Sequence, residues 1–596
     1  MKLLLEPPSS LTPRQRALLW ITLLFVIATR VYALSRTLWD WDEVQFAAGV
    51  REFNVGHPFH HPHPPGFPLY MLAAKIVRPF VESDFIACQT IVFLSACALF
   101  PLAFFVAREL RFPFATSYSA ALLFVFLPNV WFFGGTAFSD IPGVAASLAA
   151  AMLLLRGCRS PRAYLGGAIV LGVAAGIRPQ ALLLGCAPFL AASWFQLRQS
   201  WLRVIGACAI VAAIVSASYI GAALASNSIA AYRVELLVVR NWVRGVDSFL
   251  SPQRPPLREL ADDYFVRAVT GGRRLPYIIS ALAAFGLLAG FFRSRISVWL
   301  AVATFIPFTL FAYLMLDYNS VHRYSTAYVF LWALLAAHGT GVLFAPLRGL
   351  GAFAQVIFVA LLAARAVQWT IPALREVRTT AAPPYAAMQW IRTNVSPRRP
   401  VWVHGSLEPF AEYFLEHRDA HLVYDLTTLP RVGIGARDFY VAEGLLPTAE
   451  AVFLRPRDRV WEIARHRYFE TSIVRLSNVW GFGEGWYGEE SDGRAIWQWM
   501  GARSETLLPA IRGPARLTMT LAAAGGITPE IEVQLNGAVI DRFRCGQDPV
   551  KRQWTAGSRA DAPNRLVIVS SGTVKVAPDP RDLSVQLISY SWQPVR

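Results

Sequence analysis

Apolar residues run along the first two thirds of the chain in stretches of near-spanning length. A hydrocarbon core about 30 Å thick needs about 20 apolar residues in a helix. On length and apolarity we predict about eleven membrane-spanning helices. They lie near 17–35, 86–107, 115–133, 141–156, 163–177, 181–196, 203–225, 276–292, 297–316, 325–345 and 350–369.

Arginines between these stretches predict the orientation of the helices. With alternating helices, four arginine-bearing loops fall on one side: "RELR" (108–111), "RGCRSPR" (156–162), "LRQSWLR" (197–203) and "RSR" (293–295). Positive loops favour the cytoplasm, so the N-terminus is predicted to be cytoplasmic, with the first apolar run retained as a helix. The opening loop, the turn at Asp140, the loop 227–275, the turn 317–324 and the C-terminal region are then extracytoplasmic. Part of 227–275 mixes arginines and apolar residues at helical spacing, which is typical of an amphipathic helix in the interface.

The pattern changes after Trp369, where spanning stretches stop. Short apolar runs then alternate with helical segments, which predicts a small α/β module. From about 482 only strand patterns remain, and Asn536-Gly537 between two of them indicates a hairpin with a type I′ turn. The predicted fold is a polytopic α-helical membrane domain (1–372), an α/β module (373–481) and a β-sandwich resembling a jelly roll (482–596).

Composition supports this class of protein. Of 596 residues, 55% are hydrophobic and only 16% are charged, whereas soluble proteins carry about 25% charged residues. The net charge of +17 comes mostly from the loop arginines, and no nucleic-acid motif accompanies it. The six cysteines contain no CxxC pair and predict neither a zinc module nor a disulfide framework. We expect an integral protein of a bacterial inner membrane, in contact with membrane lipids and not with nucleic acid.

The opening loop carries the acids that suggest chemistry, in "WDWDEVQFAAGVREF". On a helix, neighbouring residues point about 100° apart, so Asp42 and Glu43 face different directions. One carboxylate is suited to remove a proton from an acceptor hydroxyl while the other orients that acceptor. The alternative is that Asp40, Asp42 and Glu43 are solvated loop residues, and the spacing alone does not decide.

Further candidates lie at three more turns on the same predicted side. Asp140 begins a helix of small residues, where it acts either as an N-terminal cap or as a second functional acid. Arg178 sits between two short apolar stretches and needs a partner or a wet cavity, because a charge near the hydrocarbon is costly. Arg323 and Tyr324 form another turn, and two converging guanidinium groups suit a phosphate or diphosphate. Anchoring at lipid headgroups is the alternative for Arg323.

Four histidines in the opening loop, at 57, 60, 61 and 63, raise the question of a metal. Imidazole binds zinc well, but prolines are interspersed among these residues, no acid lies among them and no HExxH motif occurs. Prolines that stiffen an extended loop explain the segment better. The sequence indicates no cofactor, although it leaves a divalent metal open.

These residues together resemble the GT-C superfamily of membrane glycosyltransferases, and within it the protein O-mannosyltransferase and aminoarabinose transferase families. The likeness spans about residues 10–345. The motifs that carry it are Asp42-Glu43 in the first outer loop, His63-Pro64-Pro65, the acid Asp140 in "AFSD", the turn Gly176 to Gln180, and Arg323-Tyr324.

The resemblance implies an inverting transfer of a sugar from a polyprenyl-phosphate donor at the outer membrane face. It implies that Asp42 is the general base, that Glu43 positions the acceptor and that Asp140 supports either. Arg178 and Arg323, with Tyr324, would hold the donor phosphate, and His63 and Asp40 would belong either to the acceptor site or to the structure of the loop. Asp40 leaves open which acid is the base. The acceptor, a hydroxyl of a lipid, glycan or protein, is also open, because here the soluble part is C-terminal rather than an insert between late helices.

Two other functions compete with this hypothesis. A transporter or flippase of lipid-linked sugars predicts ionisable residues near the membrane midplane and two related halves. The candidate residues lie instead at outer turns, and no internal repeat is apparent. A polymerase or ligase of surface polysaccharide would share the arginines but would not need Asp42-Glu43.

Overall fold

The computed structural model comprises two units that are each compact. Unit 1 combines Met1–Ala382 with Pro456–Tyr468, and unit 2 combines Pro383–Arg455 with Phe469–Arg596. The division into three domains with the expected boundaries stays a prediction. The structure describes all residues except 1–3, 270–271, 273, 294, 425–437, 447–448, 456–457, 465–469, 477–478, 492–495, 561, 578 and 596.

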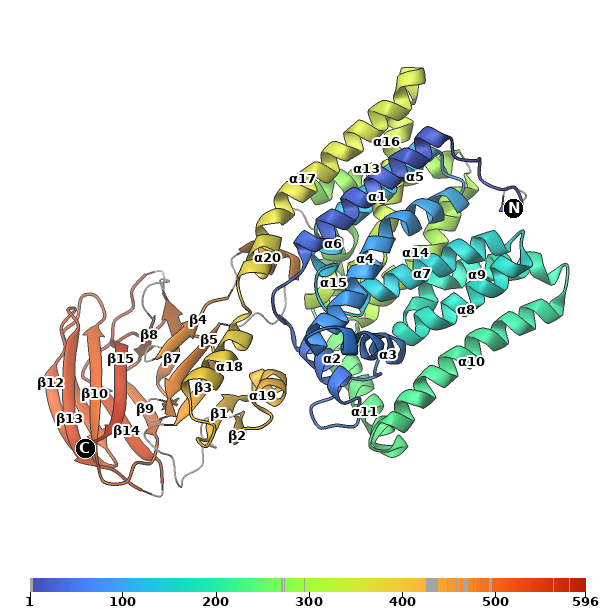
Figure 1. Cartoon of the computed structure of the whole chain (residues 1–596). Coiled ribbons are helices and arrows are strands. Elements are labelled where there is room, and N and C mark those ends of the chain that lie inside the picture. The colour runs from blue at the N-terminus through green and yellow to red at the C-terminus, as the bar shows by residue number, and fades with distance from the viewer. Residues whose placement is uncertain are drawn as a thin grey trace. The chain divides into compact units, whose positions relative to one another are not determined.

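Unit 1 is a bundle of apolar helices (Figure 1). Seven helical stretches in the described part are long and apolar enough to cross a membrane: α1 (Pro13–Ala33), α4 (Asp84–Glu109), α7 (Asp140–Gly157), α10 (Trp201–Ala225), α13 (Leu275–Phe292), α14 (Ile296–Met315) and the stretch Ala345–Asn394, which contains α17 (Gly351–Thr379). A pair bent by 61°, Tyr318–Ala327 and α16 (Val329–Leu343), raises this to eight if it forms one span. Three apolar helices are shorter: α5 (Phe114–Phe126), α8 (Pro161–Ile177) and α9 (Ala181–Leu197). The polytopic helical class is confirmed, whereas eleven spans stay a prediction.

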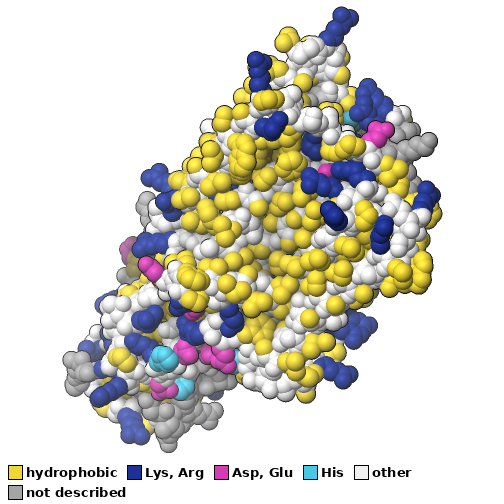
Figure 2. Space-filling model, turned by 45° about the vertical axis from the view of Figure 1, so that its right-hand side comes forward, with side chains coloured by type: hydrophobic (Ala, Val, Ile, Leu, Met, Phe, Trp, Pro, Cys, Tyr) yellow, Lys and Arg dark blue, Asp and Glu magenta, His cyan; other side chains and the backbone are white. Residues whose placement is uncertain are grey.

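The surface of unit 1 fits a lipid environment. Large apolar side chains are exposed along α1 and α10, such as Trp20, Leu24, Ile205 and Leu224, all more than half exposed. Figure 2 shows hydrophobic side chains covering one face as a broad continuous surface. In water such a surface is an aggregation hazard, because soluble monomers rarely expose apolar patches beyond a few hundred Å². Together with the long apolar helices, it indicates an integral membrane protein.

Glycines allow two helices of the bundle to approach closely. A Cβ atom on Gly286 of α13 would overlap the carbonyl oxygen of Leu335 in α16, and one on Gly339 of α16 would overlap that of Leu282 in α13. Small residues permit such backbone contact between membrane helices, where packing rather than hydrophobicity drives association. This contact helps to hold α16, which follows the turn that carries Arg323.

Short helices close one end of the bundle. α2 (Trp41–Arg51) and α3 (Pro68–Val77) both pack against α4. α6 (Pro128–Phe133) precedes α7, and α15 (Val321–Tyr324) precedes α16. The loop between α2 and α3 is tied to the start of the 227–275 region, where Ser226 Oγ accepts the amide hydrogen of Val55 at 3.1 Å.

The 227–275 region contains the predicted amphipathic helix. α11 (Ile229–Trp242) continues into a π-helical turn (Val243–Asp247), and α12 (Leu257–Ala261) continues into another (Asp262–Val266). Of the residues in α11, only Tyr232 is buried. Placement of this helix in the membrane interface stays a prediction.

Unit 2 begins with α18 (Pro383–Asn394) and a five-stranded mixed sheet of order β2-β1-β3-β5-β4. Its strands are β1 (Val401–His404), β2 (Ala420–Val423), β3 (Phe439–Glu443), β4 (Ala451–Phe453) and β5 (Thr471–Arg475). β1 is parallel to β2 and β3, and α19 (Glu408–Leu415) connects β1 to β2. One of the helical segments expected in the α/β module covers 457–469, and the structure has α20 (Asp458–Ala464) there. Residues 465–469 lie outside the described residues. The contacts of α20 assign it to unit 1.

The rest of unit 2 forms two five-stranded antiparallel sheets of orders β13-β10-β15-β8-β7 and β12-β11-β14-β9-β6. Both sheets contribute to one buried apolar core, as the predicted β-sandwich requires. Asn536 and Gly537 have φ of 52° and 88°, which fits the type I′ turn expected between β11 and β12. The strands are β6 (Gly481–Phe482), β7 (Trp486–Ser491), β8 (Ile496–Met500), β9 (Arg503–Leu508), β10 (Pro514–Ala523), β11 (Glu530–Leu535), β12 (Ala538–Arg544), β13 (Val550–Gly557), β14 (Asn564–Ser570) and β15 (Val585–Pro594).

The close approach of α13 and α16 leads to a stability prediction. Gly286→Leu should lower the unfolding temperature of the protein in detergent, because overpacking costs about 1–3 kcal/mol or more. Gly206→Leu in α10 is the matched control, since nothing lies within 4 Å of a Cβ at that position. Equal unfolding temperatures for the two variants would contradict the close packing.

Candidate active site

The start of α2 is fixed by two of the three acids of the opening loop. The Asp40 carboxylate caps the helix by accepting the amide hydrogen of Asp42 at 2.9 Å. Glu43 Oε2 accepts the amide hydrogens of Trp39 at 2.7 Å and Asp40 at 3.2 Å, which completes a capping box. Both side chains are therefore buried against the backbone rather than directed into a cavity.

Glu43 also connects α2 to the segment before α7. Its Oε1 accepts the amide hydrogen of Ala137 at 2.7 Å, and the side chain has no exposed surface. Burial raises the pKa of Glu43 to about 7, against the opposing effect of these backbone hydrogen bonds. The carboxyl group thus joins the first loop to the segment that carries Asp140, three residues beyond Ala137.

Four side chains from separate parts of unit 1 form a continuous series of ion pairs of alternating sign, which we call the charge chain. It runs from Arg178 to Asp140, Arg323 and Asp42. Arg178 Nη1 lies 2.6 Å from Asp140 Oδ2, and Arg323 Nε lies 3.8 Å from the same oxygen. Arg323 Nη1 donates a hydrogen bond of 2.7 Å to Asp42 Oδ2. All four side chains are at most 18% exposed.

Local backbone geometry explains how Arg178 reaches Asp140. α8 ends at Ile177, and Arg178 follows in an extended conformation. Its side chain lies over Gly143, one turn into α7, where a Cβ would come within 3.2 Å of Arg178 Cδ. Arg178 Nη1 also donates to Ser139 Oγ at 3.2 Å. The first turn of α7 and the residue before it therefore receive this guanidinium group.

Aromatic rings surround the two guanidinium groups. Arg178 lies 5.4 Å from the ring centroid of Phe67, and Arg323 lies 4.7 Å from that of Phe138. Arg323 also donates from Nη2 to the Tyr324 hydroxyl at 2.9 Å. Aromatic faces stabilise a cation while excluding water, so the arginines remain charged in a partly dry site.

His63 lies beside the Asp42 end of the charge chain. Its Nδ1 is 3.9 Å from Asp42 Oδ1, and its ring packs 4.9 Å from Phe67 and 5.4 Å from Phe46. Burial, assisted by the positive charges of Arg323 and Arg178, lowers the pKa of His63 to about 4, although Asp42 acts in the opposite direction. The imidazole is therefore neutral near pH 7.

A small pocket, partly open to solvent, lies at the Arg178 end of the charge chain. Asp140 and Arg178 lie on its wall, whereas most of its other lining side chains are apolar. The remaining lining residues are Gly143, Val144, Ser147, Ala181, Leu184, Phe308, Thr326 and Ala327.

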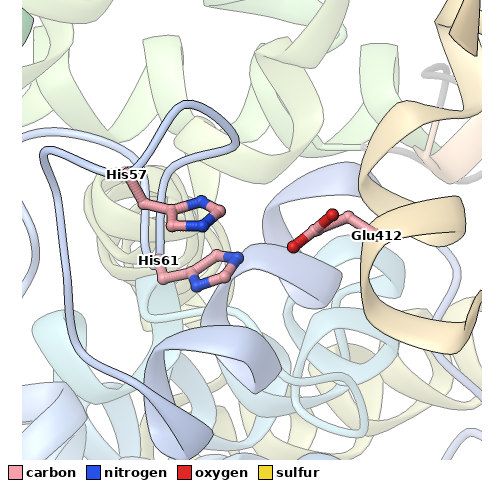
Figure 3. A group of neighbouring side chains, drawn as sticks. All are labelled: His57, His61 and Glu412. Atoms are coloured by element: carbon pink, nitrogen blue, oxygen red, sulfur yellow. The ribbon is translucent and has the colours of Figure 1, made fainter. Parts of the chain in front are cut away.

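The other histidines of the opening loop lie apart from the charge chain. The rings of His57 and His61 stack with centroids 4.0 Å apart, as Figure 3 shows. Burial and the neighbouring His57 lower the pKa of His61 to about 4. His60 Nε2 lies 2.8 Å from Glu235 Oε2 of α11, which ties the loop to that helix.

The structure brings together most residues that the sequence singled out. Asp42, Asp140, Arg178, Arg323, Tyr324 and His63 form one contiguous cluster. Asp40 and Glu43 flank Asp42 at the start of α2, and their carboxylates accept hydrogen bonds from backbone amides. Sequence reasoning missed Ser139 and Gly143, which receive Arg178, and the rings of Phe67 and Phe138. Their only signal was adjacency to residues already selected, in "AFSDIPG" and "PPGFP".

No protein-family model matches the chain, and no curated protein matches its sequence. Among solved structures it is similar to ArnT from Cupriavidus metallidurans bound to undecaprenyl phosphate, with 14% identity, a TM-score of 0.49, and coverage of 77% of this chain and 97% of that chain. It is also similar to the arabinofuranosyltransferase AftD from mycobacteria, with 12% identity, a TM-score of 0.42, and coverage of 99% and 62%. At these identities and TM-scores the likenesses assign no activity to the chain.

The buried position of Glu43 gives a spectroscopic prediction. A protonated carboxyl band in infrared difference spectra should titrate with a midpoint near pH 7 and should be missing from Glu43→Gln. Because the folded pKa lies above the ordinary value of 4.5, the folded protein keeps a proton that the unfolded chain has lost. The free energy of unfolding should therefore fall by up to about 3 kcal/mol as pH rises from about 4.5 to about 7. A band that persists in Glu43→Gln would contradict the assignment.

Proposed function

We propose that the protein is an inverting glycosyltransferase that moves a sugar from a polyprenyl-phosphate donor to a hydroxyl acceptor at the outer face of the membrane. The observation that carries the proposal is the charge chain, in which two nearly buried arginines share Asp140 while a second acid, Asp42, pairs with one of them. Such a site contains what this transfer requires, namely anion stabilisation for the leaving phosphate and a carboxylate to accept a proton.

The arginines are suited to the phosphate of the donor. Guanidinium groups bind phosphate oxygens through paired hydrogen bonds, and these bonds strengthen where water is excluded. Arg178 and Arg323 approach the same Asp140 oxygen, so both groups reach one small region of space. A phosphate placed there would contact both guanidinium groups. It would keep both contacts while negative charge develops on the leaving group.

The pocket beside Arg178 suits the lipid that carries the phosphate. Val144, Leu184 and Phe308 give it an apolar wall, whereas Asp140 and Arg178 mark one end. An amphiphile with an anionic head and a hydrocarbon tail matches this polarity. The first isoprenoid unit would lie against the apolar wall while the phosphate remains with the arginines.

Binding of the donor would also release the base. Arg323 Nη1 donates a hydrogen bond of 2.7 Å to Asp42 Oδ2. A donor phosphate competes for this guanidinium group, and each hydrogen bond that Arg323 gives to phosphate weakens its bond to Asp42. The carboxylate then becomes available to an acceptor hydroxyl on the side where His63 lies.

The reaction is a single displacement at the anomeric carbon. The acceptor oxygen forms a bond to that carbon as its proton passes to Asp42, and the bond from the carbon to the phosphate oxygen breaks with its electron pair. Polyprenyl phosphate leaves with one more negative charge than it had in the donor, stabilised by Arg178 and Arg323. One displacement inverts the anomeric configuration.

The remaining acids serve as positioning residues. Asp40 and Glu43 set the start of α2, and hence the direction of Asp42, through their bonds to the backbone. Asp140 orients both arginines, and Tyr324 accepts a hydrogen bond from Arg323. No metal is required by this mechanism, because the arginines supply the positive charge.

The location of the charges favours an enzyme over a transporter. Asp140 is the first residue of α7, and Arg178 directly follows α8. A transporter of charged lipid-linked sugars is expected to carry its ionisable groups near the midplane. The charge chain lies instead at helix ends, as an enzyme that meets its acceptor at the membrane surface would require.

Removal of the proposed base tests the assignment. Asp42→Asn should lower kcat for transfer from a radiolabelled polyprenyl-phosphate sugar by about 10²–10⁴-fold, because an amide cannot accept the proton. The protein should be assayed in lipid vesicles, with donor binding measured separately. Glu82→Gln, an exposed acid in the turn before α4, is the matched control and should retain full activity. Undiminished transfer by Asp42→Asn would overturn the role of Asp42.

The phosphate site has its own test in a different kinetic parameter. Arg178→Lys keeps a positive charge but loses the paired donors, so kcat/KM for the donor should fall about 10²-fold or more. Product inhibition by undecaprenyl phosphate should weaken in parallel, whereas KM for the acceptor should change little. Arg258→Lys, an exposed position in α12, is the control. If Arg178→Lys altered only the acceptor KM, the assignment of the donor phosphate to this arginine would be wrong.

A further inference from the structure

The mixed sheet of unit 2 has a topological switch point. The chain leaves β1 for β2 on one side and then crosses to β3 on the other side of β1, and all three strands are parallel. In open α/β sheets, loops diverge at such a switch point, and ligands bind outside the carboxyl ends of the strands. The switch point here lies between β1 and β3.

Polar side chains end both of these strands. His404 is the last residue of β1, and Glu443 is the last residue of β3. His404 Nδ1 lies 3.5 Å from Glu443 Oε2 and 2.6 Å from Ser406 Oγ. Both the His404 and Glu443 side chains are about one third exposed, at 32% and 34%.

The hydrogen bonds of His404 determine what it presents to a ligand. Its Nδ1 accepts the amide hydrogen of Ser406 at 3.2 Å, so the ring proton of the neutral imidazole is on Nε2. The serine, histidine and glutamate therefore do not form a hydrolytic triad, because Ser406 and Glu443 approach the same ring nitrogen. This edge of the sheet instead offers an Nε2–H donor, a hydroxyl group and carboxylate acceptors.

An aromatic ring lies at the neighbouring strand end. Tyr424 directly follows β2 and is 67% exposed, and its hydroxyl donates to Glu408 Oε2 at 2.8 Å. A Cβ on Gly405 would overlap this ring, so the glycine lets the ring lie against the turn after β1. The edge thus combines an exposed aromatic face with two carboxylates.

We propose that this edge is a sugar-binding site, formed by His404, Ser406, Glu408, Tyr424 and Glu443 and here called the strand-edge site. Carboxylates accept hydrogen bonds from adjacent sugar hydroxyls, the imidazole donates one, and the tyrosine ring packs against the C–H face of a pyranose. The ligand class is an uncharged or amino sugar.

The charge of the strand-edge site excludes an anionic ligand. Glu408 and Glu443 are both acidic, and the strand-edge site contains neither arginine nor lysine. A sugar phosphate would be repelled there, in contrast to the charge chain of unit 1, which has two arginines. The strand-edge site is therefore not a second donor site, and its occupancy does not depend on whether the protein transfers a sugar.

Saturation-transfer difference NMR on the full-length protein in lipid nanodiscs tests the proposal. The probes are methyl α-D-glucopyranoside, glucosamine and the phosphate ester of glucose, without any lipid-linked donor. We expect the first, the second or both to show saturation transfer, and the phosphate ester to show none. Tyr424→Ala and Glu443→Gln should each weaken binding about tenfold or more, as loss of one charge-assisted bond predicts.

Two matched control variants distinguish the loss of a sugar contact from a general disturbance of unit 2. Leu454→Ala removes another exposed apolar side chain of unit 2, and Glu416→Gln removes another exposed acid. Both should bind the probes as the unaltered protein does. Three outcomes would overturn the proposal. The first is that Tyr424→Ala binds the sugars as well as the unaltered protein does. The others are that the phosphate ester binds, or that neither the uncharged sugar nor the amino sugar binds. The experiment contains no lipid-linked donor. Its result therefore does not depend on whether the protein transfers a sugar.

Discussion

The ion pairs of the charge chain are the constraint on which the end of unit 1 depends. A charged side chain near hydrocarbon costs several kcal/mol unless it is paired or hydrated. Arg178 and Arg323 are nearly buried, and each is neutralised by an acid from a distant part of the chain. The charges of the two cations and two anions sum to zero. The four members of the charge chain therefore hold together α2, α7, α15 and the end of α8.

If the charge chain binds a donor phosphate, as we propose, its ion pairs must exchange partners. An incoming phosphate cannot add to the four charges without leaving excess negative charge in a partly dry site. It must displace a carboxylate from an arginine. Asp140 contacts both arginines, and Asp42 pairs with Arg323 and lies beside the neutral His63. In the proposed reaction the phosphate displaces Asp42 from Arg323, and this exchange would let Asp42 act as the base.

Local sequence patterns predicted much of this architecture. Apolar stretches located the helices, and Asn536-Gly537 located a hairpin, because both signals depend only on neighbouring residues. The pairing of Asp42 with Arg323 spans 281 positions, and no local pattern encodes it. The sequence also did not show that α20 packs in unit 1, because an isolated helical segment does not identify the surface that buries it. Equally, a glycine such as Gly143 is informative only once its neighbour, Arg178, is known.

The way in which α2 begins gives its three neighbouring acids different contacts. The first turn of a helix has amide hydrogens without intrahelical partners, and carboxylates nearby are drawn to them. Asp40 and Glu43 occupy the two positions that satisfy these amides, at the cap and three residues later. Asp42 lies between them, rotated about 100° from Glu43, and its carboxylate is directed to Arg323 instead. The capping box thus uses two acids to fix the helix, whereas the third, Asp42, pairs with Arg323 and is the acid that we propose as the base.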